Sequence, residues 1–149
     1  MTSSRRILGA VAALLLVCSL SSCGDPVKKY CSALNADRTA IANMLAQPSP
    51  NALISNLPML QSLGASAPED LTDEWQTFLG AIVGLRDALH AAGLRPEQFH
   101  DGRPPAGLPS SRRQAIKAAA DTLSSPQVVQ AADGIDQEAR DVCQINLGM

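Results

Sequence analysis

One stretch of the chain, Pro68 to Ala92, constrains the fold more than any other. Glu69 and Asp70 suit the first turn of a helix, and Gly93 suits its end. The apolar side chains between them recur every three or four residues, which places them on one side of an α-helix. They are Leu71, Trp75, Phe78, Ile82, Leu85 and Leu89. The spacing therefore predicts a long helix with one face in a core.

Two further helical stretches precede this one. Asp25-Pro26 is typical of an N-cap followed by a first helical residue, and this helix should end before the loop Gln47-Pro48-Ser49-Pro50. The next stretch, residues 51–63, contains Pro58, which predicts a kink or a division into two short helices.

Two more helices are expected toward the C-terminus. Residues 94–109 form a proline-rich loop with room for one turn at 96–99, and a helix resumes at Ser110 or Ser111. Ser125-Pro126 begins the last helix. Across these flanking helices the residues expected to face inward are Val27, Cys31, Leu34, Ile41, Leu45, Leu53, Leu57, Leu60, Leu63, Ile116, Ala120, Leu123, Val128, Ala132, Ile135, Ala139, Val142 and Cys143.

No segment alternates apolar and polar residues with a period of two, so no strand is expected. Four or five helices with short or medium connections predict an all-α protein, an antiparallel bundle. At 149 residues the chain has room for one domain, which we place at residues 23–149.

The first 22 residues have the organisation of a cleaved signal peptide. Arg5 and Arg6 precede an apolar run, Ile7 to Val17, whose eleven residues rise only about 16 Å as a helix. That is short of the ~30 Å hydrocarbon core of a membrane, so the run is not a membrane span.

The end of this leader, Leu20-Ser21-Ser22-Cys23, resembles the bacterial lipobox. The resemblance implies cleavage by signal peptidase II, diacylglycerol on the Cys23 sulfur and an anchor on the outer face of the cell membrane. Two or three acyl chains are sufficient for stable anchoring. An ordinary secretory signal that ends in cysteine is the alternative. Ser4-Arg5-Arg6-Ile7-Leu8 also leaves a twin-arginine export route open beside the general one.

The remaining cysteines predict a disulfide. Cys18 leaves with the leader and Cys23 carries lipid, so Cys31 and Cys143 are left in an oxidising compartment. If the first and last helices pack antiparallel, the two sulfurs lie at the same end of the bundle. Free buried thiols are the alternative.

A second resemblance covers most of the mature chain, which is similar to small helical lipoproteins of actinobacteria. It is carried by Tyr30-Cys31-Ser32-Ala33-Leu34, Ala67-Pro68-Glu69-Asp70, Trp75, Ala91-Ala92-Gly93 and Cys143. Because these proteins have no assigned function as a class, the resemblance implies no catalytic residue.

No catalytic, metal or cofactor site is expected. His100-Asp101 has no Gly-x-Ser-x-Gly partner that would supply a hydrolase nucleophile, and His90 suits the last turn of the long helix. Acidic residues near the C-terminus lack the spacing of a calcium loop, and we interpret them as a solvated face: Asp133, Asp136, Glu138 and Asp141. A formal charge of −2 does not suggest a nucleic-acid partner.

Gly80 and Gly84 are the candidate binding residues. Each glycine inside a helix costs about 1 kcal/mol relative to alanine, so a pair one turn apart indicates a close backbone approach. The approaching element is either a neighbouring helix of the same chain or a partner.

The sequence favours a membrane-anchored, extracytoplasmic lipoprotein that acts as a non-catalytic binding or interaction module of the cell envelope. A carrier of a small apolar ligand held between the helices is the alternative, and an enzyme is third. A dry apolar cavity would favour the carrier. An exposed patch of small or apolar residues would favour the interaction module, whose protein partner the sequence does not name.

Overall fold

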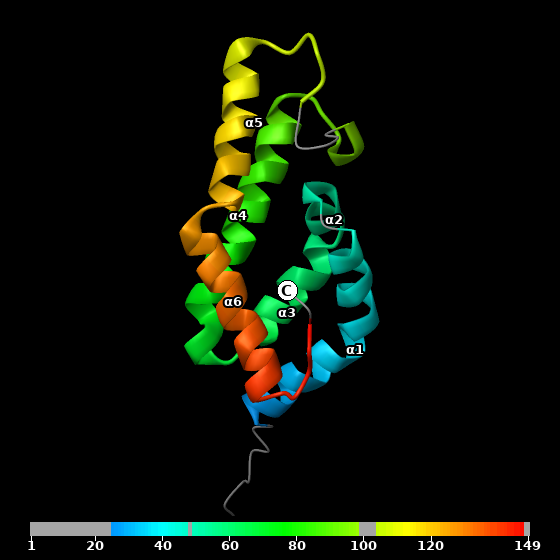
Figure 1. Ribbon diagram of the computed structural model, residues 1–149, viewed down its shortest axis with the longest axis vertical. Helices are drawn as coiled ribbons and strands as arrows, with labels where there is room; N and C mark the ends of the chain where they lie inside the picture. Colours follow the sequence, from blue (N-terminus) through cyan, green and yellow to red (C-terminus); the bar gives the residue numbers. More distant parts are fainter. Residues whose placement is uncertain (1–24, 48, 99–103, 148–149) are drawn as a thin grey trace, which may run out of the picture.

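The computed structural model describes residues 25–47, 49–98 and 104–147, and these residues are helical or irregular, without a strand (Figure 1). The all-α prediction is confirmed for this part of the chain. The predicted signal peptide (residues 1–22), Cys23 and the pair His100-Asp101 lie outside the described residues.

Six α-helices and two short 3₁₀ turns make up the described part. They are α1 (Pro26–Ala46), α2 (Pro50–Ser55), α3 (Leu57–Ser66), η1 (Glu69–Leu71), α4 (Thr72–Ala91), η2 (Pro96–Gln98), α5 (Ser110–Leu123) and α6 (Pro126–Asp141).

The helix ends follow the capping residues in the sequence. The Asp25 Oδ1 atom accepts a hydrogen bond from the backbone N–H of Val27 at 3.0 Å, which begins α1 as expected. The stretch with Pro58 divides at Asn56 into α2 and α3, which raises the helix count to six.

The long predicted helix has a different first turn. Residues 69–71 wind as the 3₁₀ turn η1, a frequent form at helix N-termini, so α4 itself begins at Thr72. At the other end Gly93 has a φ of 73°, and the Leu94 N–H donates to the Leu89 carbonyl at 2.9 Å. That pattern is a Schellman cap, which glycine permits.

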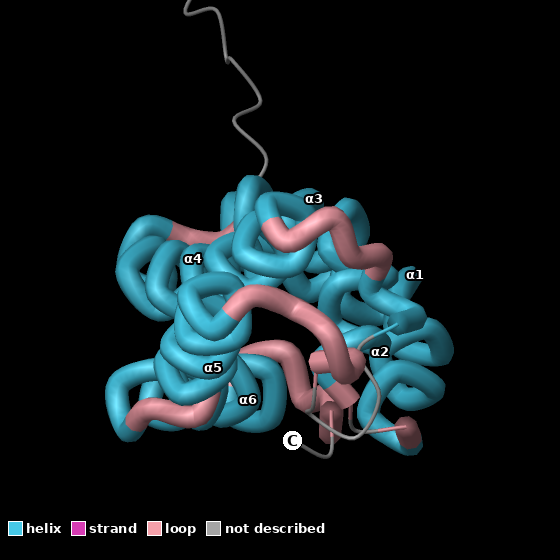
Figure 2. The backbone as a smooth tube through the Cα atoms, turned by 90° about the horizontal axis from the view of Figure 1, so that it is seen from above, coloured by secondary structure: helices cyan, strands magenta, loops and turns pink. Residues whose placement is uncertain are grey.

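Helix α4 is the central element of the molecule (Figure 1). Helices α5 and α6 lie one after the other along it, α5 beside its C-terminal half and α6 beside its N-terminal half. The guanidinium of Arg112 in α5 also donates to the Ala92 carbonyl at 3.4 Å. Helices α1, α2 and α3 occupy the other side, as the view from above also shows (Figure 2). On the side of α5 and α6, these two helices and α4 meet along a seam.

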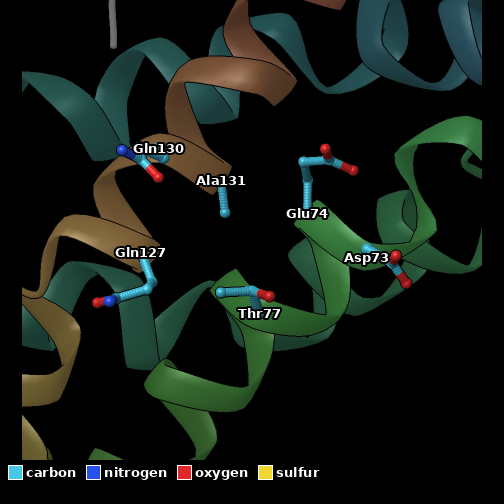
Figure 3. A pocket seen from close by; sticks show the side chains of 6 residues that line it. All are labelled: Asp73, Glu74, Thr77, Gln127, Gln130 and Ala131. Carbon is cyan, nitrogen blue, oxygen red and sulfur yellow. The ribbon is translucent and has the colours of Figure 1, made fainter.

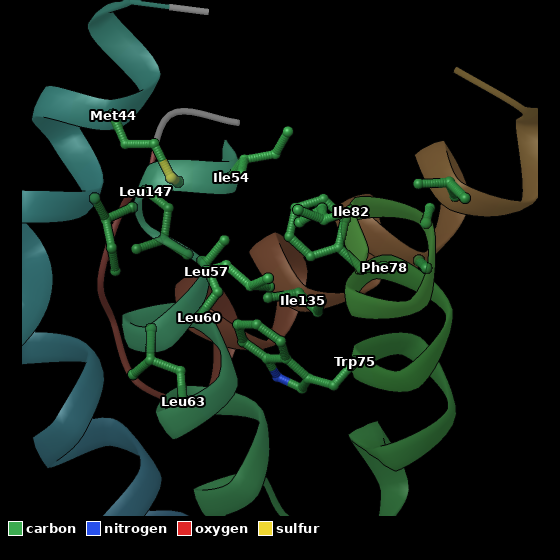
Figure 4. Packing of buried hydrophobic residues seen from close by; sticks show 14 of the residues in the cluster. Met44, Ile54, Leu57, Leu60, Leu63, Trp75, Phe78, Ile82, Ile135 and Leu147 are labelled. Atoms are coloured by element: carbon green, nitrogen blue, oxygen red, sulfur yellow. The ribbon is translucent and has the colours of Figure 1, made fainter. Parts of the chain in front are cut away.

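The core joins both sides through the predicted apolar face of α4. Figure 4 shows Trp75, Phe78 and Ile82 of α4 against residues of α2, α3 and α6. The predicted set of inward-facing residues needs correction in two respects. Val142 is 47% exposed, because α6 ends at Asp141 and the chain turns there. Eight other residues expected inside are only partly buried: Val27, Cys31, Leu45, Leu53, Ala120, Leu123, Ala132 and Cys143.

Residues 144–147 form a C-terminal tail that adds to the core. The chain reverses at Gln144, which has a φ of 57°, and the Ile145 N–H then donates to the Ala139 carbonyl at 2.7 Å. Ile145 and Leu147 are buried, and Leu147 lies among residues of α1 and α3 (Figure 4). This segment was not predicted from the sequence, since it is too short to show a periodicity.

A disulfide joins Cys31 to Cys143, as predicted. The two Cα atoms are 5.1 Å apart, within the range for an unforced bridge. It ties the second turn of α1 to the residue that precedes the tail, across a sequence separation of 112 residues. The bridge therefore fixes both ends of the described chain to each other.

Candidate functional site

Gly80 and Gly84 are exposed on α4, and a Cβ atom built on either one has no neighbouring atom within 4 Å in the described structure. Other helical glycines differ. A Cβ on Gly64 would lie 2.9 Å from Leu79, and one on Gly134 would lie 3.2 Å from Glu74. No described part of the chain therefore comes within 4 Å of a Cβ at either glycine, which favours the explanation by a partner over a crossing with a helix of the same chain.

The two glycines instead line an open groove of about 550 Å³ along the seam of α4, α5 and α6. We call it the small-residue groove. Its lining side chains carry no charge, and none is larger than valine or glutamine. They are Thr77, Gly80, Ala81, Gly84, Ala118, Ala119, Thr122, Ser125, Gln127 and Val128. Such a surface lets a second backbone approach closely, as between helices that meet through small residues.

A second, polar pocket of about 210 Å³ continues from one end of this groove, and Thr77 and Gln127 belong to both. We call it the carboxylate pocket, because Asp73 and Glu74 line it together with Gln130 and Ala131 (Figure 3). The Glu74 Oε2 atom is buried and has no hydrogen-bond partner in the described structure. Most buried polar atoms are paired, so this oxygen requires an explanation.

Two apolar spaces bear on the carrier alternative. A small apolar cavity between α1, α3, α4, α6 and Leu147 of the tail holds only about 20 Å³, which is the space of a single water molecule. An open pocket of about 260 Å³ lies where α1 ends and α2 begins, and it is mostly aliphatic. Its lining residues are Met44, Leu45, Ser49, Pro50, Leu53 and Leu123.

The acidic residues of α6 are not all solvated, which corrects the sequence interpretation. Asp136 is only 2% exposed, and its Oδ2 accepts from the guanidinium of Arg140 one turn later. It follows Ile135 at the edge of the apolar side of α6. Glu138 remains nearer the surface, and its pKa is raised by partial burial and by the negative charges of Asp70 and Asp141.

The other residues considered in the sequence as catalytic or metal-binding candidates do not form such a site in the described structure. His90 is exposed in the last turn of α4, where it was expected. Within residues 25–47, 49–98 and 104–147, no three His, Cys, Asp or Glu side chains gather as metal ligands. None of the helices in the same residues combines the length and the hydropathy of a membrane span.

Comparison of the chain with models of known protein families, with curated proteins and with solved structures gives no match. The candidate site is therefore defined by the geometry of this structure alone.

Gly80 and Gly84 were predicted from the sequence as candidate binding residues, but the other residues that line the groove were not. Thr77, Ala118 and Thr122 are exposed residues of two helices, and only the packing of α5 on α4 brings them together. Glu74, an acidic residue in the first turn of α4, was not singled out in the sequence. The signal that could have found it is Gly134, a glycine inside α6, because a Cβ there would lie 3.2 Å from the Glu74 Cγ atom.

Proposed function

We propose that the protein is a lipid-anchored, extracytoplasmic interaction module of the cell envelope, held to the membrane by acyl chains on Cys23 after removal of residues 1–22. In this proposal the mature domain is an antiparallel helical bundle. Its docking site is the small-residue groove, and it carries out no catalysis itself.

The observation that carries the proposal is the open space at Gly80 and Gly84. Glycine in the middle of a helix costs about 1 kcal/mol relative to alanine, yet alanine would meet no atom at either position. Folding therefore gains nothing in packing from these glycines. An external backbone that enters the groove would account for both.

The position of the anchor supports an accessible groove. Helix α1 begins at Pro26, three residues after Cys23, so an anchor on Cys23 would hold this end of the molecule nearest the bilayer. Acidic groups that include Asp70, Glu138 and Asp141 also influence one another there, and they would be repelled by anionic headgroups. Along α4 the groove is lined by Thr77, Gly80, Ala81 and Gly84. Figure 1 shows that α4 starts at the same end of the molecule as α1 and runs away from it.

Affinity capture of the full chain from its own membranes tests the proposal. The variant Gly80→Leu/Gly84→Leu fills the groove with side chains that meet no other part of the described structure at their Cβ atoms. A protein that co-purifies with the wild type should be lost with this variant. Ala40→Leu, on the exposed side of α1, is the matched control and should retain it. Equal recovery with all three chains contradicts the groove as the docking site.

The carrier alternative depends on the open aliphatic pocket beside α2. Its size, about 260 Å³, falls just below that of typical small-molecule sites. Mass spectrometry of the protein purified under mild conditions should then find a bound apolar molecule, and Leu53→Trp should displace it. Protein that carries no such molecule rejects the carrier.

A further inference from the structure

The C-terminal tail lies over the core as an extended segment whose side chains alternate between solvent and protein. Gln144 and Asn146 are exposed, and Ile145 and Leu147 are buried. The Ile145 N–H donates to the Ala139 carbonyl at 2.7 Å, which is the one backbone hydrogen bond of the tail within the described structure. Two apolar side chains and one hydrogen bond are therefore its noncovalent attachments there.

Leu147 covers a part of the core that the helices leave open. It forms one wall of the small apolar cavity, whose other walls are side chains of α1, α3, α4 and α6. Leu34, Leu63 and Trp75 are among them. The Leu147 side chain lies among residues of α1 and α3 (Figure 4). Without the tail, apolar side chains of the core would therefore face solvent on this side.

The disulfide holds the start of the tail to α1. Cys143 directly precedes the tail, and Cys31 lies in the second turn of α1. Val142, the residue before the bridge, is 47% exposed, so no buried contact at that point replaces the bond. Ordering the tail costs conformational entropy that is similar in size to the gain from burying its two aliphatic side chains. The closed position of the tail therefore depends on the bridge.

The helices have attachments to one another that do not involve the bridge. Helix α1 packs against α3, α3 packs against α4, and α4 packs against α5 and α6. Both cysteines are only partly buried, which leaves the bridge accessible to thiol–disulfide exchange. Loss of the bridge should consequently free the tail before it separates the helices, as a local opening of a weakly held segment.

We propose that the C-terminal tail is a redox-controlled strap. The disulfide keeps it closed, and reduction releases it and exposes the apolar side chains beneath it while the helices stay folded. This inference is independent of the docking function, since the cavity beside Leu147 and the small-residue groove have no lining residue in common.

The reductant in this proposal is a dithiol. One of its thiolates attacks a sulfur of the bridge and forms a mixed disulfide, and its second thiol then displaces the cysteine from that intermediate. The dithiol is oxidised to a disulfide. Cys31 and Cys143 receive its two electrons and two protons and become thiols.

Reduction of the purified full chain by dithiothreitol, below the melting temperature of the reduced protein, tests the inference. Trp75 is the only tryptophan of the chain and lines the same cavity as Leu147. Its emission should shift to longer wavelength, and acrylamide should quench it more strongly. The Ile145 amide should lose its protection against hydrogen exchange, whereas the Ile82 amide inside α4 should keep it. The far-UV circular dichroism of the helices should not change.

Two results of this experiment would overturn the inference. If complete reduction leaves the Trp75 emission and the Ile145 exchange unchanged, the tail stays closed without the bridge. If the helical signal is lost together with the change at Trp75, the bridge maintains the whole fold and not the strap.

Two variants of the tail separate its apolar contacts from the bridge. Ile145→Ser/Leu147→Ser removes both buried side chains and keeps the disulfide, so acrylamide should quench Trp75 strongly before any reductant is added. Asn146→Ser, at an exposed residue of the same tail, is the matched control and should behave as the wild type. A double variant that protects Trp75 as well as the wild type does would show that the tail covers nothing.

Discussion

The Trp75 indole N–H donates a hydrogen bond of 3.0 Å to the Tyr30 hydroxyl, inside the core and across 45 residues of sequence. The two rings also meet edge to face, with centroids 6.4 Å apart. Tyr30 is fully buried and Trp75 is 3% exposed. This contact joins α1 to α4, and Tyr30 directly precedes Cys31 of the disulfide. The hydrogen bond gives the buried Trp75 N–H a partner inside the core.

Removal of the acceptor should destabilise the fold. Tyr30→Phe keeps the ring but leaves the Trp75 N–H without its partner, which costs about 1–3 kcal/mol. Urea denaturation measures the loss. In a double-mutant cycle with Trp75→Phe, the two changes should be less than additive, and strict additivity would show that the hydrogen bond contributes nothing.

The same tyrosine predicts a loss of stability at high pH. Burial raises the pKa of Tyr30 from 10.0 to about 12 in the folded state. The unfolded chain then releases the phenol proton at a lower pH than the folded chain does. The contribution to stability is therefore complete below pH 10 and is lost as the pH rises toward 12. Because the chain has one tyrosine, phenolate absorbance reports it directly, and Tyr30→Phe should lack this component.

Reduction of Cys31–Cys143 should lower the melting temperature by several degrees. A closed loop of this length stabilises by up to ~4.7 kcal/mol on the chain-entropy model, and each kcal/mol shifts the melting temperature by roughly 3–5 °C. Thermal denaturation with and without reductant measures the shift. Cys31→Ser/Cys143→Ser should melt low under both conditions, and a reductant effect that persists in it would exclude the bridge as its cause.

The C-terminal tail should contribute to the core. Leu147→Ala removes a buried side chain beside Leu34 and Leu63 and should cost about 2–3 kcal/mol in urea denaturation. Gln144→Ala, at the exposed start of the tail, is not an equivalent control because of its positive φ. Asn146→Ala is exposed and should change the stability little. Equal effects of the two substitutions would mean that the tail is not packed in solution.

If Cys23 carries the lipid anchor, the protein should be labelled by fatty acid at this residue. Growth with an alkyne fatty acid should label the protein, and Cys23→Ala should remove the label and release the chain from the membrane fraction. A Cys23→Ala protein that is still labelled would contradict the lipid anchor.

The helices were predictable because local rules determine them, and the disulfide was predictable because only Cys31 and Cys143 remained after the leader and the lipid site were assigned. Apolar residues at spacings of three and four define the buried side of α4, and Asp25 and Gly93 mark helix ends through their own backbone chemistry. The groove was not predictable, because it arises only where residues of three helices meet. The prediction that Asp136 is solvated was wrong, because the sequence alone does not show whether a charged residue at the edge of the apolar face of a helix is buried.

In the proposed function, Gly80 and Gly84 serve the groove and not the fold. Denaturation of Gly80→Ala and Gly84→Ala tests it most directly, with Gly64→Ala as the comparison, since a Cβ there would lie 2.9 Å from Leu79. Each of the two groove variants should be more stable than the wild type by up to about 1 kcal/mol, because alanine is the better helix former and meets no atom. Gly64→Ala should gain less than either, because its Cβ displaces the end of the Leu79 side chain and crowds the Trp75 ring. Destabilisation by Gly80→Ala or Gly84→Ala would show that folding requires these glycines, and would contradict the account.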